Sequence, residues 1–275
     1  MDNINANKKD IAKIPFKNNG KENINIYDIV NRGELYFLYQ PIISLNKGQF
    51  YGSEALTRVK GYNTEHIEEI FIDAERYNLL EILERNIFKG IIEEYLLNQL
   101  HNCNIFINVT PKSLHNISEL IKNETKKYNT KYKQSYLKKV VFEVTEFVGG
   151  NIEKVDRNII EEIRSIGIKI AVDDVFSGYS RLAYIGEIKP DYIKIDKGYI
   201  TKAANEEYWY KLLKRVIMLS HSLRAKTVIE GIETEKELIT AKELKADYGQ
   251  GFYISYPVPL MNIKRKIRGN NYDNC

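Results

Sequence analysis

Cysteine is scarce in this chain of 275 residues, which contains only Cys103 and Cys275. Two cysteines so far apart do not have the spacing of a metal-binding pair. A protein that needs no disulfides is typical of a reducing compartment, and we therefore expect a cytoplasmic location. A chain of this length can bury a substantial hydrophobic core without disulfides or a structural metal.

The sequence also lacks long hydrophobic runs and a strong excess of either charge. No apolar stretch approaches the ~18 residues needed to span a membrane, and the N-terminus lacks the apolar segment of a signal peptide. A net charge of +4, from 41 basic and 37 acidic residues, is too small to predict binding to a nucleic acid polymer. We expect residues 1–24, rich in Asn and Lys, to form a flexible leader and residues 25–275 to form one domain.

Short apolar runs alternate with helical patterns from residue 35 onward. Apolar residues recur at helical spacing over residues 67–74 and 209–223, and a further helix is expected within 80–100. Strands that alternate with helices predict a parallel sheet, and eight strands are enough to close a barrel. The eight predicted strands are Leu35–Ile43, Tyr51–Val59, Asn104–Thr110, Val140–Thr145, Ile168–Asp173, Tyr192–Asp196, Thr227–Glu230 and Gln250–Ile254.

One connection is too short for a parallel arrangement. Only Ser44–Gln49 separates the first two strands, whereas a parallel crossover needs about a dozen residues or more. These strands must therefore form an antiparallel hairpin. The predicted fold is α/β, a TIM-like (β/α)8 barrel whose first strand is antiparallel. An open doubly wound sheet is the alternative, but no glycine-rich nucleotide-binding loop follows any predicted strand.

Polar residues lie in or directly after the predicted strands, mostly near their carboxyl ends, where the active sites of parallel barrels lie, and Gln250 begins the eighth. A single acid at such a position is usually a helix cap or part of a solvated edge, so the inference rests on the coincidence of many. Buried charges need compensation, and a surplus of carboxylates over one Lys and one Arg requires added positive charge. The residues are Glu54, Arg58, Asn108, Glu143, Glu146, Asp173, Asp174, Lys194, Asp196, Glu230, Glu233 and Gln250.

The residue types at these positions favour a divalent metal with oxygen ligands. Carboxylates and an amide suit Mg²⁺ or Mn²⁺ rather than zinc or copper, and no histidine falls at a strand end that belongs to the site. Adjacent Asp173 and Asp174 could serve two ions about 4 Å apart, which would hold a phosphate and activate a water. No Ser–His–Asp or Cys–His nucleophile is apparent. The residues alone therefore predict a metal-assisted phosphoester hydrolase.

Seven blocks follow one another along the chain: YQPIISLNKGQFYGSEALTR at 39–58, FINVT at 106–110, FEVTE at 142–146, AVDD at 171–174, PDYIKID at 190–196, VIEGIET at 228–234 and YGQGFYISYP at 248–257. Together they resemble the motifs of EAL domains, including the triplet Glu54–Ala55–Leu56 that names the family. The resemblance covers roughly residues 30–260. It implies a barrel with a reversed first strand, as the hairpin does, and hydrolysis of cyclic di-GMP to linear pGpG with Mg²⁺ or Mn²⁺.

The resemblance also implies roles for individual residues. The implied metal ligands are Glu54, Asn108, Glu143 and Asp173 for the first ion and Asp174 for the second. Lys194 would position or activate the attacking water, and Glu230 would assist as ligand or base. The remaining contacts, to substrate or metal, would come from Gln40, Arg58, Glu233 and Gln250. Two ions are expected, with Ca²⁺ as an inhibitory substitute, and the implied partners are cyclic di-GMP and a second copy in a homodimer.

One block departs from the family pattern. The usual loop after the two aspartates reads Phe-Gly-Thr-Gly-Tyr-Ser, whereas residues 175–180 read VFSGYS, with Phe176 in the place of a glycine. If that position needs a positive φ, a bulky residue costs roughly 1–2 kcal/mol or moves the loop 175–177. Glu146 and Ser180, which resemble the pair that stabilises this loop, are both present. The alternatives to an active enzyme are a weak or inactive domain that acts as a cyclic di-GMP receptor, and an interaction module.

Overall fold

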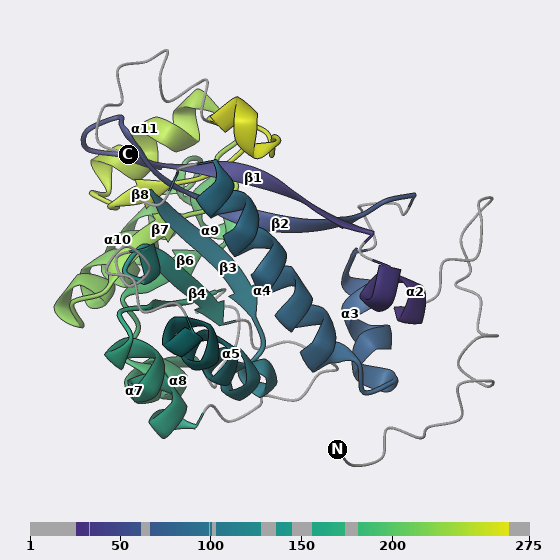
Figure 1. Ribbon diagram of the computed structural model, residues 1–275. Coiled ribbons are helices and arrows are strands. Elements are labelled where there is room, and N and C mark those ends of the chain that lie inside the picture. The colour runs from purple at the N-terminus through teal and green to yellow at the C-terminus, as the bar shows by residue number, and fades with distance from the viewer. Residues whose placement is uncertain are drawn as a thin grey trace.

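The computed structural model describes residues 26–32, 34–61, 67–98, 100, 103–127, 136–144, 156–173 and 181–263, so the predicted leader at 1–24 lies outside the described residues. Within the described part, eight strands close into a barrel in chain order (Figure 1). The strands are β1 Leu35–Ser44, β2 Phe50–Val59, β3 Asn104–Val109, β4 Val140–Val144, β5 Lys169–Val172, β6 Tyr192–Ile195, β7 Lys226–Ile229 and β8 Tyr248–Gly249. The predicted TIM-like barrel is confirmed.

The first strand runs against its neighbours, as the short connection predicted. β1 pairs antiparallel with both β2 and β8, whereas every other neighbouring pair in the barrel is parallel. The hairpin closes with hydrogen bonds from the Ser44 amide to the Gln49 carbonyl and from the Gly48 amide to the Ser44 carbonyl, both 2.8 Å long. Gly48 has a φ of +65°, a conformation that glycine adopts without strain.

Helices surround the barrel on its outside (Figure 1). They are α2 Ile26–Arg32, α3 Ile67–Arg76, α4 Leu80–Leu97, the 3₁₀ turn η2 Pro111–Ser113, α5 Leu114–Lys127, α7 Arg157–Ser165, α8 Arg181–Ile188, α9 Lys197–Ala203, α10 Glu207–Ser222 and α11 Glu235–Glu243. The predicted helices at 67–74, 80–100 and 209–223 correspond to α3, α4 and α10. None of the described helices has the length and hydrophobicity to cross a membrane.

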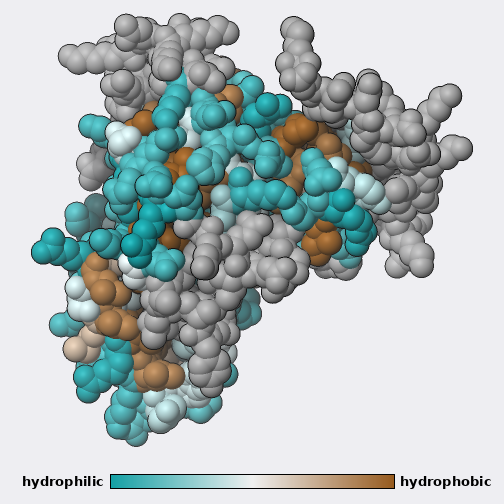
Figure 2. Space-filling model, turned by 90° about the horizontal axis from the view of Figure 1, so that it is seen from below, coloured by the Kyte–Doolittle hydropathy of each residue, from teal (hydrophilic) through white to brown (hydrophobic). Residues whose placement is uncertain are grey.

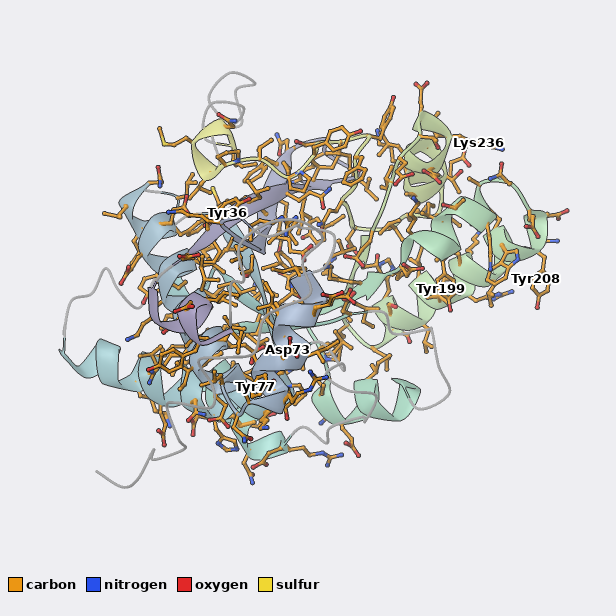
Figure 3. All side chains as sticks on the ribbon, turned by 90° about the vertical axis from the view of Figure 1, so that its right-hand side faces the viewer. Tyr36, Asp73, Tyr77, Tyr199, Tyr208 and Lys236 are labelled. Atoms are coloured by element: carbon orange, nitrogen blue, oxygen red, sulfur yellow. The ribbon has the colours of Figure 1, made fainter. Side chains whose placement is uncertain are left out.

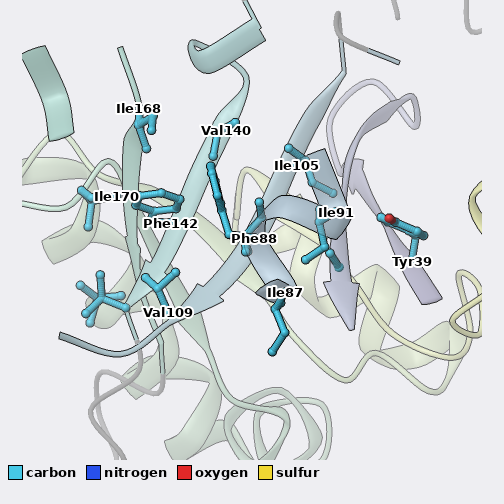
Figure 4. Close-up of a cluster of buried hydrophobic side chains, with 14 of the residues drawn as sticks. Tyr39, Ile87, Phe88, Ile91, Ile105, Val109, Val140, Phe142, Ile168 and Ile170 are labelled. Carbon is cyan, nitrogen blue, oxygen red and sulfur yellow. The ribbon is translucent and has the colours of Figure 1, made fainter. Parts of the chain in front are cut away.

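The hydrophobic core lies in two layers, because successive strand residues face opposite sides of the sheet. Most buried apolar side chains form a layer between strands and helices, where Ile87, Phe88 and Ile91 of α4 lie near Ile105 and Phe142 of the strands (Figure 4). A small cluster fills part of the barrel interior and contains Ile42, Phe106, Val141, Ala171, Tyr192 and Val228. Apolar side chains therefore fill one level of the barrel interior, and the buried polar side chains lie at another level.

The outer faces of the helices are largely hydrophilic, as is typical of helices around a barrel. Hydrophilic side chains cover most of the described surface in Figure 2, with hydrophobic residues between them. Tyr208 of α10 and Lys236 of α11 lie at the periphery in Figure 3, and Tyr208 is exposed.

The prediction for the eighth strand is wrong. The strand is Tyr248–Gly249, and the chain has left the sheet by Gln250, whereas Gln250–Ile254 was predicted. The aromatic and β-branched residues after Gly251 suggested a strand, but the Tyr253 amide bonds to the Ile232 carbonyl at 2.9 Å. A Cβ on Gly251 would lie 2.2 Å from the Ile232 backbone, so only glycine permits this approach. The other seven strands agree with prediction to within one residue at each end.

Candidate active site

The centre of the candidate site is the ammonium group of Lys194, which is 1% exposed. Its neighbours Ile193 and Ile195 face the helices, so Lys194 points into the barrel. The Nζ atom lies 2.5 Å from Glu143 Oε1, 2.6 Å from Glu230 Oε1 and 3.2 Å from Glu54 Oε2. Strands β2, β4, β6 and the end of β7 thus bring together one cation and three carboxylates, all four of them residues singled out from the sequence.

Glu54 accepts hydrogen bonds from two amides as well as from Lys194. Asn108 Nδ2 donates to Glu54 Oε1 at 2.9 Å, and Gln250 Nε2 donates to Glu54 Oε2 at 2.6 Å. Gln250 Nε2 also lies 2.8 Å from Gln40 Oε1, and Gln40 Nε2 donates to the Ser255 carbonyl at 3.2 Å. Because Gln40, Glu54 and Gln250 are all buried, this network fixes the side of the site formed by β1, β2 and the residue after β8.

The charges divide the three glutamates into two kinds. Burial acts to raise the pKa of Glu54, but Lys194 and the amides of Gln250 and Asn108 hold it below its ordinary value. Burial, together with the charge of Glu54, raises the pKa of Glu143 well above its ordinary value. Burial likewise raises the pKa of Glu230, assisted by the charge of Asp173. Lys194 therefore offsets the charge of Glu54, while Glu143 and Glu230 bind protons more readily than an ordinary glutamate.

Lys194 is held in its charged form. Burial acts to lower the pKa of Lys194, but the charges of Glu143, Glu230 and Glu54 outweigh burial and raise the pKa well above its ordinary value. An ammonium group with a raised pKa donates hydrogen bonds and does not accept a proton. Lys194 can therefore orient or stabilise a reacting group, but it cannot act as a general base in this state.

The donor set fits a divalent cation. Carboxylate oxygens of Glu54, Glu143 and Glu230 all lie within 4.8 Å of one another. Glu143 Oε2 is buried and has no hydrogen-bond partner among the described residues. A buried carboxylate oxygen normally has a donor, and a cation would supply its missing partner. With the Asn108 side chain beside them, these hard oxygen donors suit Mg²⁺ or Mn²⁺.

Asp173 and Arg58 lie next to this cluster. Asp173 directly follows β5 and is close enough for its charge to raise the pKa of Glu143 and Glu230. Arg58 lies four residues after Glu54 on β2, on the same face of the strand. Its Nη1 atom donates to the Thr57 carbonyl at 2.8 Å. Both residues therefore lie close enough to the cluster to interact with its charges.

Two predicted polar residues have other partners. Glu233 Oε1 pairs with Lys197 Nζ at 2.6 Å, and both side chains are more than a third exposed. Asp196 caps α9 by accepting a hydrogen bond from the Gly198 amide at 2.7 Å, as a single acid at a strand end often does. Asp174, Glu146, Ser180 and the loop 175–177 lie outside the described residues.

Sequence reasoning missed three residues around the site. Lys197 directly follows the block at 190–196, but only the fold shows that it reaches Glu233. Ser255 contributes its backbone carbonyl, which no sequence pattern reveals. Glu84 is buried behind β3 and bonds to Thr110. An acid on the otherwise apolar face of the helix predicted within 80–100 is a signal that could have identified Glu84.

Comparison with known proteins shows which family the chain resembles. The model of the EAL domain family matches residues 25–257. The chain is 28% identical over 257 residues to "Probable cyclic di-GMP phosphodiesterase PdeN" of Escherichia coli K12, covering 88% of this chain and 47% of PdeN. It is 30% identical over 232 residues to "Cyclic di-GMP phosphodiesterase PdeA" of Borreliella burgdorferi, covering 81% of this chain and 33% of PdeA. The chain thus spans about half or less of these relatives.

Solved structures agree with the family match. An EAL domain protein from Listeria monocytogenes has a TM-score of 0.73 and 25% identity, with 90% of this chain and 98% of that chain covered. The FimX EAL domain of Xanthomonas citri, solved in complex with c-diGMP, has a TM-score of 0.72 at 15% identity, covering 86% of this chain and 92% of that chain, which supports the fold alone. With the family model matched over most of the chain, the protein belongs to the EAL domain family.

Proposed function

We propose that the chain is a metal-dependent phosphodiesterase that hydrolyses cyclic di-GMP to linear pGpG. The observation that carries the proposal is the cluster of Glu54, Glu143 and Glu230 around Lys194, at the end of the barrel where active sites lie. Membership of the EAL family supports it, as do relatives named cyclic di-GMP phosphodiesterases. Carboxylates repel a dianionic substrate, so a bound cation is needed before the substrate can bind next to this cluster.

The proposed first ion is Mg²⁺ or Mn²⁺, held by Glu54, Asn108, Glu143 and Asp173, and a second is held by Asp174. When bound, the ions supply Lewis acidity and lower the pKa of a bound water. In this proposal Lys194 donates a hydrogen bond that orients the attacking water. Glu230, whose pKa is raised, is the proposed proton acceptor. The proposed substrate contacts are Gln40, Arg58, Glu233 and Gln250.

The ligands present favour an enzyme over a receptor or an interaction module. Calorimetry with cyclic di-GMP in Mg²⁺, in Ca²⁺ and in EDTA separates the possibilities. The proposal predicts binding with either ion, no turnover in Ca²⁺, and much weaker binding in EDTA. Binding of equal affinity in EDTA would contradict the metal-linked site, and binding without turnover in Mg²⁺ or Mn²⁺ would identify a receptor. Absence of binding would leave an interaction module.

We also propose a homodimer in the cytoplasm, with residues 25–275 forming one domain. The family resemblance supports the homodimer, and the scarcity of cysteine supports the location. Sedimentation velocity measures the oligomeric state directly.

Replacing Arg58 by Ala is expected to weaken cyclic di-GMP binding about 10-fold or more with a smaller change in kcat. The reason is that a guanidinium beside the metal cluster can hold a substrate phosphate through charge-assisted hydrogen bonds. The measurement is calorimetry in Ca²⁺ together with steady-state kinetics in Mn²⁺. Arg76→Ala is the control, because Arg76 lies exposed on α3 and pairs only with Asp73 among the contacts described. An unchanged Kd in Arg58→Ala would show that Arg58 does not hold the phosphate.

Metal affinity is expected to fall as the pH is lowered from the alkaline side toward the ordinary pKa of a glutamate. Glu143, a proposed ligand, and Glu230 beside it have raised pKa values in the metal-free protein, so protons that bind this cluster compete with the ion. For the same reason the folded protein binds protons that the unfolded chain has released at pH values above about 4.5. Metal-free stability should therefore decrease as the pH rises through this range. Calorimetric titration with Mn²⁺ in buffers of different ionisation enthalpy counts the protons released, and a pH-independent affinity would contradict this assignment.

A further inference from the structure

Glu84 is a carboxylate buried on the face of α4 that packs against the barrel. The other residues on this face are apolar and include Leu80, Leu83 and Ile87, whereas Glu84 is 3% exposed. Burial of a carboxylate is costly unless hydrogen bonds compensate for the lost water. An acid at this position therefore needs a specific partner.

Both oxygens of Glu84 contact Thr110, the residue that follows β3. Glu84 Oε1 accepts from the Thr110 amide at 2.9 Å, and Glu84 Oε2 accepts from the Thr110 hydroxyl at 2.7 Å. Ser113 Oγ lies 3.4 Å from the same hydroxyl. Thr110 and Ser113 are themselves buried. The Glu84 carboxylate therefore binds Thr110 in the buried layer between α4 and the barrel.

These contacts lie directly after β3, the strand that carries Asn108. Along β3, Ile105, Ile107 and Val109 face the helices, whereas Phe106 and Asn108 face the interior. By this alternation Thr110 would face inward, but its hydroxyl reaches Glu84 on α4. Thr110 lies between the end of β3 and the 3₁₀ turn at Pro111 with an extended backbone, and Glu84 binds its amide and its hydroxyl there.

Asn108 lies two residues before Thr110, so the position of its side chain depends on where the end of β3 lies. Its carboxamide is 2.9 Å from Glu54 Oε1, beside the oxygens that fit a cation. A ligand on the last residues of a strand loses its orientation if the strand end can move. Residues behind metal ligands tune affinity in this way without touching the ion.

We propose that Glu84 is a positioning residue for the metal site, and that it acts through Thr110 to hold the carboxamide of Asn108 against Glu54. The proposal rests on the proposed function only in taking Asn108 as a metal ligand. Glu84 itself touches neither the cluster of Glu54, Glu143 and Glu230 nor Lys194 in any contact described.

The first test compares Mn²⁺ affinity in variants of the full chain by calorimetry. Glu84→Met keeps the length of the side chain but removes both acceptors, and should weaken Mn²⁺ binding about 10- to 100-fold. Glu84→Gln should stay within about threefold of the wild type, because its amide can accept from the Thr110 amide and donate to the hydroxyl. Glu94→Met is the matched control on the same helix, where Glu94 accepts from the Tyr39 hydroxyl at 3.0 Å, and no change is expected.

A double-mutant cycle separates positioning from a general loss of structure. If Glu84 acts through Asn108, Glu84→Met should have almost no further effect on Mn²⁺ affinity once Asn108 is replaced by Ala. An equal loss with and without the Asn108 side chain would overturn the proposal. A Glu84→Gln variant with Mn²⁺ affinity as low as that of Glu84→Met would also overturn it. The negative charge of Glu84, rather than its hydrogen bonds to Thr110, would then set the affinity. If Glu84→Met does not fold, Thr110→Val removes only the hydroxyl contact and should change affinity in the same direction.

A measurement on the metal-free protein keeps this proposal distinct from the proposed function. In ¹⁵N NMR spectra, the Asn108 carboxamide signals should shift and lose protection from hydrogen exchange in Glu84→Met but not in Glu94→Met. Unchanged Asn108 signals would overturn the positioning role whether or not the wild type binds Mn²⁺. Shifted signals in a protein that binds no Mn²⁺ would support the positioning of Asn108 while contradicting the proposed function.

Discussion

Replacing Lys194 by Met is expected to lower the free energy of unfolding of the metal-free protein by about 3–5 kcal/mol. Lys194 is the cation that three carboxylates share, and its side chain is 1% exposed. Met has a similar length but no charge and no donor, so the buried carboxyl groups of Glu54, Glu143 and Glu230 would lose the ammonium group that they share. Removal of one partner from a buried ion pair is far more costly than the loss of a surface pair.

The measurement is urea denaturation in EDTA and again with excess Mn²⁺. An ion that binds only the folded state should restore much of the lost stability in Lys194→Met, because the variant no longer has a competing ammonium group. Turnover should remain low even then, since the group that orients the water is gone. Lys197→Met is the control, because Lys197 forms an exposed pair with Glu233 and should change stability by less than about 1 kcal/mol. Equal losses in the two variants would refute the central role of Lys194.

Replacing Glu54 by Gln is expected to reduce kcat about 10²- to 10³-fold and to weaken Mn²⁺ binding. Glu54 joins three elements of the site, since it accepts from Lys194, Asn108 and Gln250. Gln preserves the shape but removes the charge, and its amide cannot accept from all three donors at once. The loss should therefore appear in both metal binding and turnover.

Steady-state kinetics in Mn²⁺ and calorimetry with Mn²⁺ alone provide the two measurements. Glu207→Gln is a suitable control, because Glu207 is exposed at the start of α10 and pairs with Lys211. Its kcat and Mn²⁺ affinity should match the wild type. If Glu54→Gln retained normal Mn²⁺ affinity, Glu54 would not be a metal ligand, even if turnover fell.

The fold could be predicted closely because its signals are local. The loop Ser44–Gln49 alone required the antiparallel hairpin, and the structure pairs β1 antiparallel with β2 and β8. The eighth strand was misplaced because Phe252–Ile254 has the composition of a strand. The Tyr253 amide bonds instead to the Ile232 carbonyl after β7, and the Ile254 amide bonds to the Gly251 carbonyl, where Gly251 approaches Ile232 closely. Gly251 and Ile232 are far enough apart in the sequence that no local sequence pattern predicts their contact.

The candidate site could be predicted as a set of residues but not as a set of contacts. Glu54, Glu143 and Lys194 were grouped because each interrupts an apolar strand, and in the structure Lys194 bonds to both glutamates. The partner of Glu233 could not be predicted, because Lys197 reaches it from the start of another helix. Glu84 was missed for a similar reason, because its partner Thr110 lies 26 residues further along the chain, directly after β3.

Incubation of the wild-type protein with cyclic di-GMP and Mn²⁺, followed by chromatographic separation of the nucleotides, tests the proposed function most directly. The cluster around Lys194 predicts that cyclic di-GMP disappears and linear pGpG accumulates, with no conversion in EDTA and none in Ca²⁺. Cyclic di-GMP that remains intact in Mn²⁺ after prolonged incubation with stoichiometric protein would contradict the assignment of this site as a phosphodiesterase.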